Sequence, residues 1–358
     1  MTLHHSERTA HTFASFSEAP QTALPPAKFR RSVLSQTTCA SILAGMLTVA
    51  ALAPHAAQAQ GAYPSKPLKL VVPFPPGGAT DVVARIVATG LSERLGQPIV
   101  IDNRVGAGGV MGTDAAAKSA PDGYTLLAVF DNFTTNPFLF KNVESDPVRD
   151  FAPIAQLVRS YQLLVVPPSL GVKRLDEFVA LAKTRGNAIN YATAGAGTSS
   201  HLAMELFKVT AGIDPTAIHF KGGNPAMTAI VGSQVDVMMV TTGTAMPHVR
   251  AGKLLALAVS SARPVAALAD LPQIAQTFPG FQTQSWAGFV APAGTPSEII
   301  ARLNHETLAT LANADVAQKL QVQGYEVVGS SPEVLAELIR TETVRWGTLI
   351  RDRKITLE

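Results

Sequence analysis

Residues 68–81 read LKLVVPFPPGGATD, and this stretch decides the fold class. The apolar, β-branched run at 68–72 is typical of a buried strand, and a proline–glycine loop follows it. From Thr80 to Leu95 apolar residues recur every three to four positions, which predicts an amphipathic helix. A strand that passes through a short loop into a helix is the βα unit of α/β proteins.

The same unit recurs along the chain. Further strand candidates are 98–101, 124–130, 162–166, 188–192, 217–220, 235–240, 255–259 and 286–291. Helical periodicity lies between most of these strands, and 296–311, 316–323 and 332–350 make the last third of the chain helical. This alternation predicts an α/β protein with largely parallel sheets and helices on both faces of each sheet.

Nine strands exceed one small sheet, so we expect two α/β domains. Breaks that contain proline, at 167–169 and 278–280, suggest where the chain passes between them. We place one domain at 60–165 together with 287–358, and the other at 166–286. Two crossings form a hinge, and the cleft between the domains is then the natural ligand site.

Residues 1–59 have the layout of a secretory signal. A basic cluster at 28–31 precedes an apolar run of small residues at 39–53, and 57–59 reads A-Q-A. The apolar run is shorter than the roughly 20 residues that span a bilayer, which disfavours a retained membrane anchor. Two adjacent arginines in the basic cluster leave a twin-arginine signal open beside a Sec signal. We therefore expect export and a mature chain that begins near Gln60.

Charge and cysteine content exclude several functions for the mature chain. Without residues 1–59 it has 25 Lys and Arg against 24 Asp and Glu, a formal charge of +1. Such a balance offers no basic field for nucleic acid. The single cysteine, Cys39, lies in the predicted signal, so we expect no disulfide, thiolate nucleophile or cysteine-ligated metal.

The loop after the first strand is the first candidate ligand site. Its glycines let backbone approach a ligand, and the next helix begins with unpaired N–H groups beside the positive end of the helix dipole. That arrangement binds a carboxylate or a phosphate. An ordinary βα turn, with Thr80 as N-cap and Asp81 facing the dipole, is the alternative. The candidate residues are Phe74, Pro76, Gly77, Gly78, Ala79, Thr80 and Asp81.

A second glycine-rich loop, TAGAGTSSH at 193–201, also follows a strand and precedes a helix. Three hydroxyls and a histidine gather at a helix N-terminus that needs one cap, and the surplus donors suit an anionic pair of oxygens. The alternative is a capped helix with solvated neighbours. The candidate residues are Ala194, Gly197, Thr198, Ser199, Ser200 and His201.

Two further loops carry polar side chains at strand ends. Asp131 and Asn132, in a stretch flanked by Phe130 and Phe133, offer contacts to a polar group of a ligand, or form a solvated turn. Thr241 and Thr242 follow the strand at 235–240 and either contact a ligand or cap a helix.

Catalytic patterns are scarce. The mature histidines show no spacing typical of metal ligands, and no pair of carboxylates stands out. The loop at 193–201 lacks the continuation of a nucleophile elbow. We expect no catalytic residues, no metal and no cofactor.

Seven motifs together resemble the Bug-type extracytoplasmic solute receptors of tripartite tricarboxylate transporters. In chain order they are YPSKP (63–67), VPFPPGGATD (72–81), GAGG (106–109), APDGYTLL (120–127), GTSSHL (197–202), AGKL (251–254) and APAGTP (291–296), and the resemblance covers essentially the whole mature chain. The resemblance implies a periplasmic-binding-protein type II fold and a monomer that captures a small organic carboxylate. It also implies a membrane permease as partner and no chemistry.

By the same resemblance, the loop at 74–81 meets one end of the ligand and the loop at 197–201 holds a carboxylate. The chain departs from the family at two places. Relatives often carry Phe-Asp-Asn or Phe-Asp-Ser where this chain has Val-Thr-Thr at 240–242, and an Asp-bearing loop at 130–132 replaces a small Ser/Thr/Gly stretch. The phenylalanines at 74, 130 and 133 favour a carboxylate with an aromatic or otherwise apolar body.

Two alternatives stay open. A sensor on the same fold would deliver its liganded form to a signalling partner instead of a permease. An exported enzyme would need an acid–base or nucleophile set that the sequence does not display.

Overall fold

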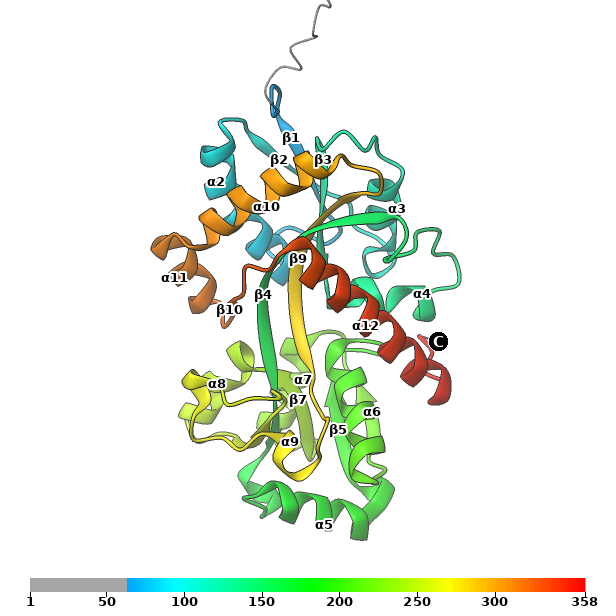
Figure 1. Cartoon of the computed structure of the whole chain (residues 1–358). Coiled ribbons are helices and arrows are strands. Elements are labelled where there is room, and N and C mark those ends of the chain that lie inside the picture. Colours follow the sequence, from blue (N-terminus) through cyan, green and yellow to red (C-terminus); the bar gives the residue numbers. More distant parts are fainter. Residues whose placement is uncertain (1–62, 358) are drawn as a thin grey trace, which may run out of the picture. The chain divides into compact units, whose positions relative to one another are not determined.

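The computed structural model describes residues 63–357, in which helices and strands alternate (Figure 1). The chain from Gln60 onward forms one compact unit. The predicted secretory signal lies outside the described residues. Among residues 63–357, none of the helices is both long enough and apolar enough to cross a membrane.

The strands match the predicted positions closely, and short 3-10 helices (η) lie in several loops. The strands are β1 (Leu68–Val72), β2 (Ile99–Asn103), β3 (Thr125–Phe130), β4 (Phe151–Val166), β5 (Asn190–Thr193), β6 (Thr216–His219), β7 (Val237–Thr241), β8 (Leu255–Val259), β9 (Gln284–Pro292) and β10 (Glu326–Val327). The α-helices are α2 (Ala79–Leu95), α3 (Val110–Ala117), α4 (Asn136–Leu139), α5 (Leu175–Arg185), α6 (Ser199–Ala211), α7 (Gly223–Val231), α8 (Thr242–Arg250), α9 (Ile274–Thr277), α10 (Ser297–Leu311), α11 (Ala314–Val322) and α12 (Pro332–Asp352). The loop after β3 forms η3 (Asp131–Thr134).

The sheet is mixed, which corrects the expectation of largely parallel sheets. Its order is β2-β1-β3-β9-β4-β7-β5-β6, and β8 and β10 also pair with β4. The pairs of β1 with β2 and β3, and of β5 with β6 and β7, are parallel. Every pair that involves β4 or β9 is antiparallel. The βα units form the two parallel parts, and the two long connecting strands are inserted between them.

The first half of β4 was not predicted from the sequence, because the period of two is interrupted there. The register against β9 shifts between Pro153 and Ala155 and again between Gln156 and Val158. Such bulges move side chains to the other face and break the alternation on which a strand prediction depends.

β4 and β9 connect two bodies, which we call lobes. Lobe 1 comprises β1, β2, β3, β9, β10 and residues 151–161 of β4; lobe 2 comprises β5 to β8 and residues 162–166 of β4. The change of partner along β4 falls between Tyr161, which pairs with β9, and Gln162, which pairs with β7. Two strands thus form the hinge of this two-lobed α/β fold, as expected. The residue limits of the two domains stay a prediction.

Each lobe has a hydrophobic core on both faces of its part of the sheet. In lobe 1, α2 and α10 cover one face and α3 and α12 the other. In lobe 2, α5 and α6 pack on one face and α7 and α8 on the other. Burial of these apolar side chains is the main stabilising term, and it holds the strand ends that carry the candidate loops.

The helix α12 makes a third link between the lobes. Leu335 and Ile339 pack on the sheet of lobe 1, whereas Trp346 and Leu349 pack against Leu202 of α6 in lobe 2. The C-terminal part of α12 therefore lies beside α6, as Figure 1 shows.

Candidate functional site

The loop before α6 is held together by its own hydroxyl groups. The Thr198 hydroxyl donates to the carbonyl of Gly195 at 2.7 Å, and the Ser200 Oγ accepts from the N–H of Ala194 at 2.9 Å. The same two hydroxyls lie 3.0 Å apart. These side chains shape the loop, so they are not surplus donors for a ligand as the sequence suggested.

His201 is buried and contributes no positive charge. Its Nδ1 accepts a hydrogen bond from the Gly197 N–H at 3.0 Å, which leaves the proton of the neutral ring on Nε2. Burial and, less strongly, the neighbouring His219 together lower the pKa of His201 to about 4. The imidazole is therefore neutral at pH 7 and supports the loop.

Ser199 and the backbone of the first turn of α6 are the groups left for a ligand. Leu202 is the first residue whose N–H bonds back into the helix, to the carbonyl of Thr198 at 2.9 Å. The N–H groups of residues 199–201 precede it and have no acceptor within the helix. They lie beside the positive end of the helix dipole, where a carboxylate is stabilised.

Asp131 of lobe 1 faces this turn. Its carboxylate accepts a 2.6 Å hydrogen bond from the Ser285 hydroxyl of β9, and it lines the same small cavity as Ser199 of lobe 2. Burial and, less strongly, the negative charge of Glu342 together raise the pKa of Asp131 to about 6, against the opposing effect of its hydrogen bonds. A carboxylate of the protein therefore lies where a carboxylate of the solute was expected.

The space that remains between Asp131 and α6 is small. A cavity of about 20 Å³ lies there, room for roughly one water molecule. Asp131 is the only charged side chain on its wall. The wall consists of Asp131, Asn132, Thr135, Gln162, Gly197, Ser199, Leu202, Thr283, Gln284 and Trp346. A solute can enter only if the lobes move apart or Asp131 is displaced.

The proline–glycine loop at 74–81 is built around Asp81. This buried carboxylate accepts from the N–H of Gly77 at 2.8 Å, from Arg85 Nε at 2.8 Å and from Asn103 Nδ2 at 2.9 Å. Burial alone would raise the pKa of Asp81, but these three hydrogen bonds outweigh it and the pKa is lowered. Asp81 is thus a structural anion that holds the loop.

The helix after this loop begins at Ala79 with Gly78 as its N-cap, so the reading of Thr80 as N-cap is wrong. Thr80 is buried, whereas the loop from Pro75 to Gly77 is exposed. No residue from 74 to 81 lines either cavity described here. The loop that precedes α6 thus lines the small cavity, and the loop that follows β1 lines neither of the two cavities.

Thr241 and Thr242 separate in the structure. Thr241 is the N-cap of α8 but makes no side-chain cap bond, and its hydroxyl lies 3.1 Å from that of Thr244. The Thr242 hydroxyl lies 3.1 Å from Ser160 Oγ of β4. Of the two, Thr242 alone lines a cavity, the larger one.

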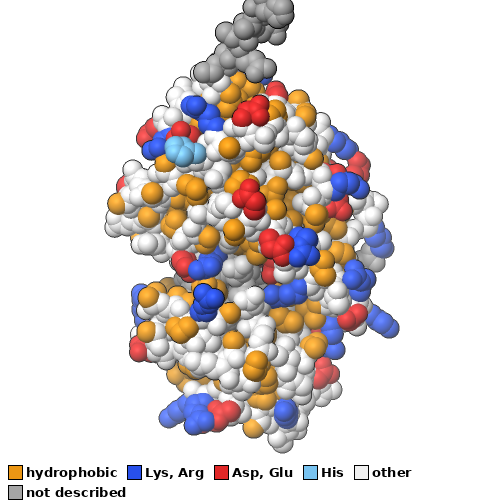
Figure 2. Space-filling model, in the orientation of Figure 1, with side chains coloured by type: hydrophobic (Ala, Val, Ile, Leu, Met, Phe, Trp, Pro, Cys, Tyr) orange, Lys and Arg blue, Asp and Glu red, His pale blue; other side chains and the backbone are white. Residues whose placement is uncertain are grey.

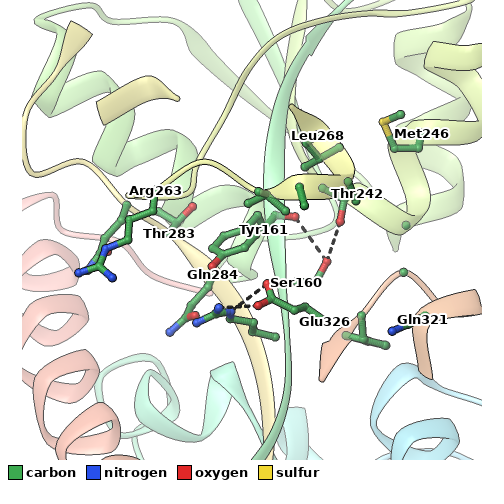
Figure 3. A pocket seen from close by; sticks show the side chains of 18 of the residues that line it. Ser160, Tyr161, Thr242, Met246, Arg263, Leu268, Thr283, Gln284, Gln321 and Glu326 are labelled. Carbon is green, nitrogen blue, oxygen red and sulfur yellow. Dashed lines mark hydrogen bonds and ion pairs between the residues drawn. The ribbon is translucent and has the colours of Figure 1, made fainter. Parts of the chain in front are cut away.

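This larger cleft, of about 1060 Å³, was not predicted from the sequence. It lies between α8 and residues 262–268 of lobe 2, and the α11–β10 turn and α12 of lobe 1 (Figure 3). In Figure 2 the molecule is hollowed between its upper and lower parts, with charged side chains at the rim. The charged residues that line the larger cleft are Arg159, Arg250, Arg263, Glu326, Glu342 and Arg345. They are far apart in the sequence, so no local motif could reveal them.

Two α/β lobes on a two-strand hinge, with a helix N-terminus at the lobe boundary, define the periplasmic-binding-protein class of receptors. The model of the tripartite tricarboxylate transporter family receptor matches residues 83–355. The chain belongs to this family, which confirms the resemblance inferred from the seven motifs.

Named relatives agree with this assignment. The chain is 35% identical to protein BugT of Bordetella pertussis over 293 residues, 81% of this chain and 90% of BugT. It is similar to Rpa4515 of R. palustris, solved with adipate, at 34% identity and a TM-score of 0.70, covering 82% of this chain and 99% of that one. It is also similar to MatC of Rhodopseudomonas palustris, solved with malate, at 34% identity and a TM-score of 0.66, covering 80% and 100%.

Proposed function

We propose that this protein is a periplasmic receptor that captures a small organic carboxylate and delivers it to a membrane permease. Membership of the receptor family and the solved structures of relatives with adipate and malate support a carboxylate as ligand. The observation that carries the proposal is the first turn of α6, whose free N–H groups and Ser199 hydroxyl face lobe 1 at the hinge.

The proposed site is the boundary between α6 and the loops of lobe 1. The solute carboxylate binds the amides of residues 199–201 and the Ser199 hydroxyl, and Thr198, Ser200 and His201 hold the loop in shape. Asp131 and Asn132, the loop at 74–81 and Thr241–Thr242 contact the rest of the solute after the lobes rearrange. A ligand that contacts both lobes favours the arrangement in which its contacts are complete.

The proposal also includes the location of the protein, its oligomeric state and the fate of its solute. We place the protein in the periplasm after removal of residues 1–59, as a monomer that releases its solute unchanged. Mass spectrometry of the exported protein tests the cleavage, with a mature chain from about Gln60 as the expected result. Recovery of a chemically altered solute would argue for an enzyme, and capture of a sensor kinase instead of a permease would argue for a sensor.

A thermal-shift panel of mono-, di- and tricarboxylates, with adipate and malate included, tests ligand class. A ligand at about 100 times its Kd adds roughly 2.7 kcal/mol to the stability of the folded state. The variant Ser199→Ala is expected to weaken binding by about 1–3 kcal/mol and to leave the fold intact, because the Ser199 hydroxyl makes no bond within its own loop. Wild-type affinity in this variant would exclude α6 as the carboxylate site.

A further inference from the structure

The larger cleft and the small cavity of the proposed solute site are neighbours with largely different walls. Residues 159–161 of β4 line the larger cleft, whereas Gln162 lines the small cavity next to Asp131. Thr283 and Gln284, at the start of β9, line both cavities. The two cavities therefore meet at the hinge and share only these two residues.

The cleft carries an excess of positive charge. Arg159 donates to Glu326 from Nε at 3.1 Å and from Nη2 at 2.5 Å, and Arg345 Nη1 lies 3.3 Å from Glu342 Oε1. Arg250 and Arg263 have no hydrogen-bond or ion-pair partner among residues 63–357. Two of the four guanidinium groups are thus neutralised and two are not, so the cleft matches a ligand with two negative charges.

The uncompensated arginines and the paired ones come from different lobes. Arg250 ends α8 and Arg263 follows β8, both in lobe 2, whereas Arg159 and Arg345 stand on β4 and α12 on the side of lobe 1. A ligand between them therefore contacts both lobes. Guanidinium groups pair with carboxylates, sulfonates and phosphates through two parallel N–H bonds, which makes anionic oxygen groups the fitting partners.

The cleft also has apolar side chains in its wall. Tyr161, Met246 and Leu268 are among them, as Figure 3 shows, and Val322 and Tyr325 line the cleft from lobe 1. Val322 is 76% exposed although it is apolar. A ligand that covers these side chains gains stabilisation from apolar burial in addition to the charge interactions. At about 1060 Å³ the cleft is as large as sites for organic ligands of substantial size.

We propose that this cleft is a second binding site, for an organic dianion with an apolar body. Arg250 and Arg263 bind its anionic groups, and the apolar wall contacts its body. The site is distinct from the proposed carboxylate site at α6, because the linings of the two cavities share only Thr283 and Gln284.

The test uses naphthalene-1,5-disulfonate as a rigid dianion and naphthalene-1-sulfonate as its monoanionic match, titrated calorimetrically into the full chain. The double variant Arg250→Ala/Arg263→Ala is expected to bind the disulfonate at least about tenfold more weakly than the wild type does. The double variant is expected to lose less affinity for the monosulfonate than for the disulfonate. Arg302→Ala removes an exposed arginine of α10 outside both cavities and is the matched control.

The outcomes separate the two sites. The second site is supported if Arg302→Ala and Ser199→Ala bind the disulfonate as tightly as the wild type does and the double variant loses this affinity. If Ser199→Ala loses affinity for the disulfonate and the double variant keeps it, the dianion binds at α6 and the proposal is overturned. Absence of disulfonate binding to the wild type, or equal affinity in the wild type and the double variant, would also overturn it.

Discussion

Asp131 of lobe 1 and Ser199 of lobe 2 line the same small cavity at the first turn of α6, and the Ser199 hydroxyl helps to hold down the pKa of the Asp131 carboxyl group. Among residues 63–357, no Lys or Arg lines this cavity. The carboxylate of Asp131 thus takes the place that the solute carboxylate is proposed to occupy.

Replacing Asp131 by Asn is expected to tighten the binding of anionic solutes by about tenfold or more, because repulsion between two carboxylates in a dry site is removed. Calorimetric titration with a dicarboxylate measures the change. Ser285→Ala is the control, since it removes a hydrogen bond to Asp131 and leaves the charge. An Asp131→Asn variant with unchanged affinity would show that Asp131 does not face the solute.

The pH dependence of stability is expected to contain two opposing contributions. The pKa of Asp131 is raised to about 6 in the folded protein, so its charge destabilises the fold above that pH, by about 3 kcal/mol. This penalty disappears as the pH falls from 6 toward 4. The pKa of His201 is lowered to about 4, so neutral His201 favours the fold and that stability is lost as the pH falls from about 6.5 to 4.

The pH dependences that Asp131 and His201 give to the stability cancel in part in the wild type, and Asp131→Asn removes the one that comes from Asp131. Urea unfolding of the variant is therefore expected to show stability that rises with pH between 4 and 6.5 more steeply than in the wild type. Parallel curves for the two proteins would contradict the raised pKa of Asp131.

The end of α12 is expected to be fastened to α6 through Glu205. This buried carboxylate accepts from Tyr191 Oη at 2.7 Å, Lys208 Nζ at 2.8 Å and Arg353 Nε at 2.9 Å. Glu205→Gln leaves the buried Lys208 with the exposed Asp214 alone, so we expect a loss of about 3–5 kcal/mol in the free energy of unfolding. Arg353→Ala removes a partly exposed partner and is expected to cost about 1 kcal/mol. An equal or larger loss in Arg353→Ala would reverse this ranking.

A glycine contact joins the lobes on the side of the larger cleft. A Cβ at Gly324 of the α11–β10 turn would lie 2.4 Å from the Cα of Gly243 at the start of α8. Gly324→Ala is therefore expected to destabilise the protein by about 1–3 kcal/mol more than Gly171→Ala, which has a similar positive φ and open space around it. Thermal unfolding compares the two, and equal losses would mean that the lobes do not touch there.

Local patterns predicted most of the fold. Apolar residues with periods of two and 3.6 residues predicted the βα units, and α6 was correctly placed after a glycine-rich loop. The sheet became mixed because β4 and β9 join two parallel parts, and bulges hid the first half of β4. Strand direction and bulges depend on partners far away in the sequence, which a local pattern does not contain.

The site was predicted less completely, for the same reason. The loop before α6 was identified, but its hydroxyls bond each other, and this depends on the loop conformation. The contact between Asp131 and Ser199, and the gathering of Arg159, Arg250, Arg263 and Arg345 around one cleft, arise from the packing of two lobes. Residue spacing carries no signal for either.

A crystal structure with the dicarboxylate that gives the largest thermal shift decides whether α6 of lobe 2 holds the carboxylate of a captured solute. We expect a carboxylate within hydrogen-bond distance of the amides of residues 199–201, with Asp131 moved away from Ser199. A dicarboxylate bound elsewhere, with Asp131 and Ser199 still lining one small cavity, would rule out α6 as the carboxylate site.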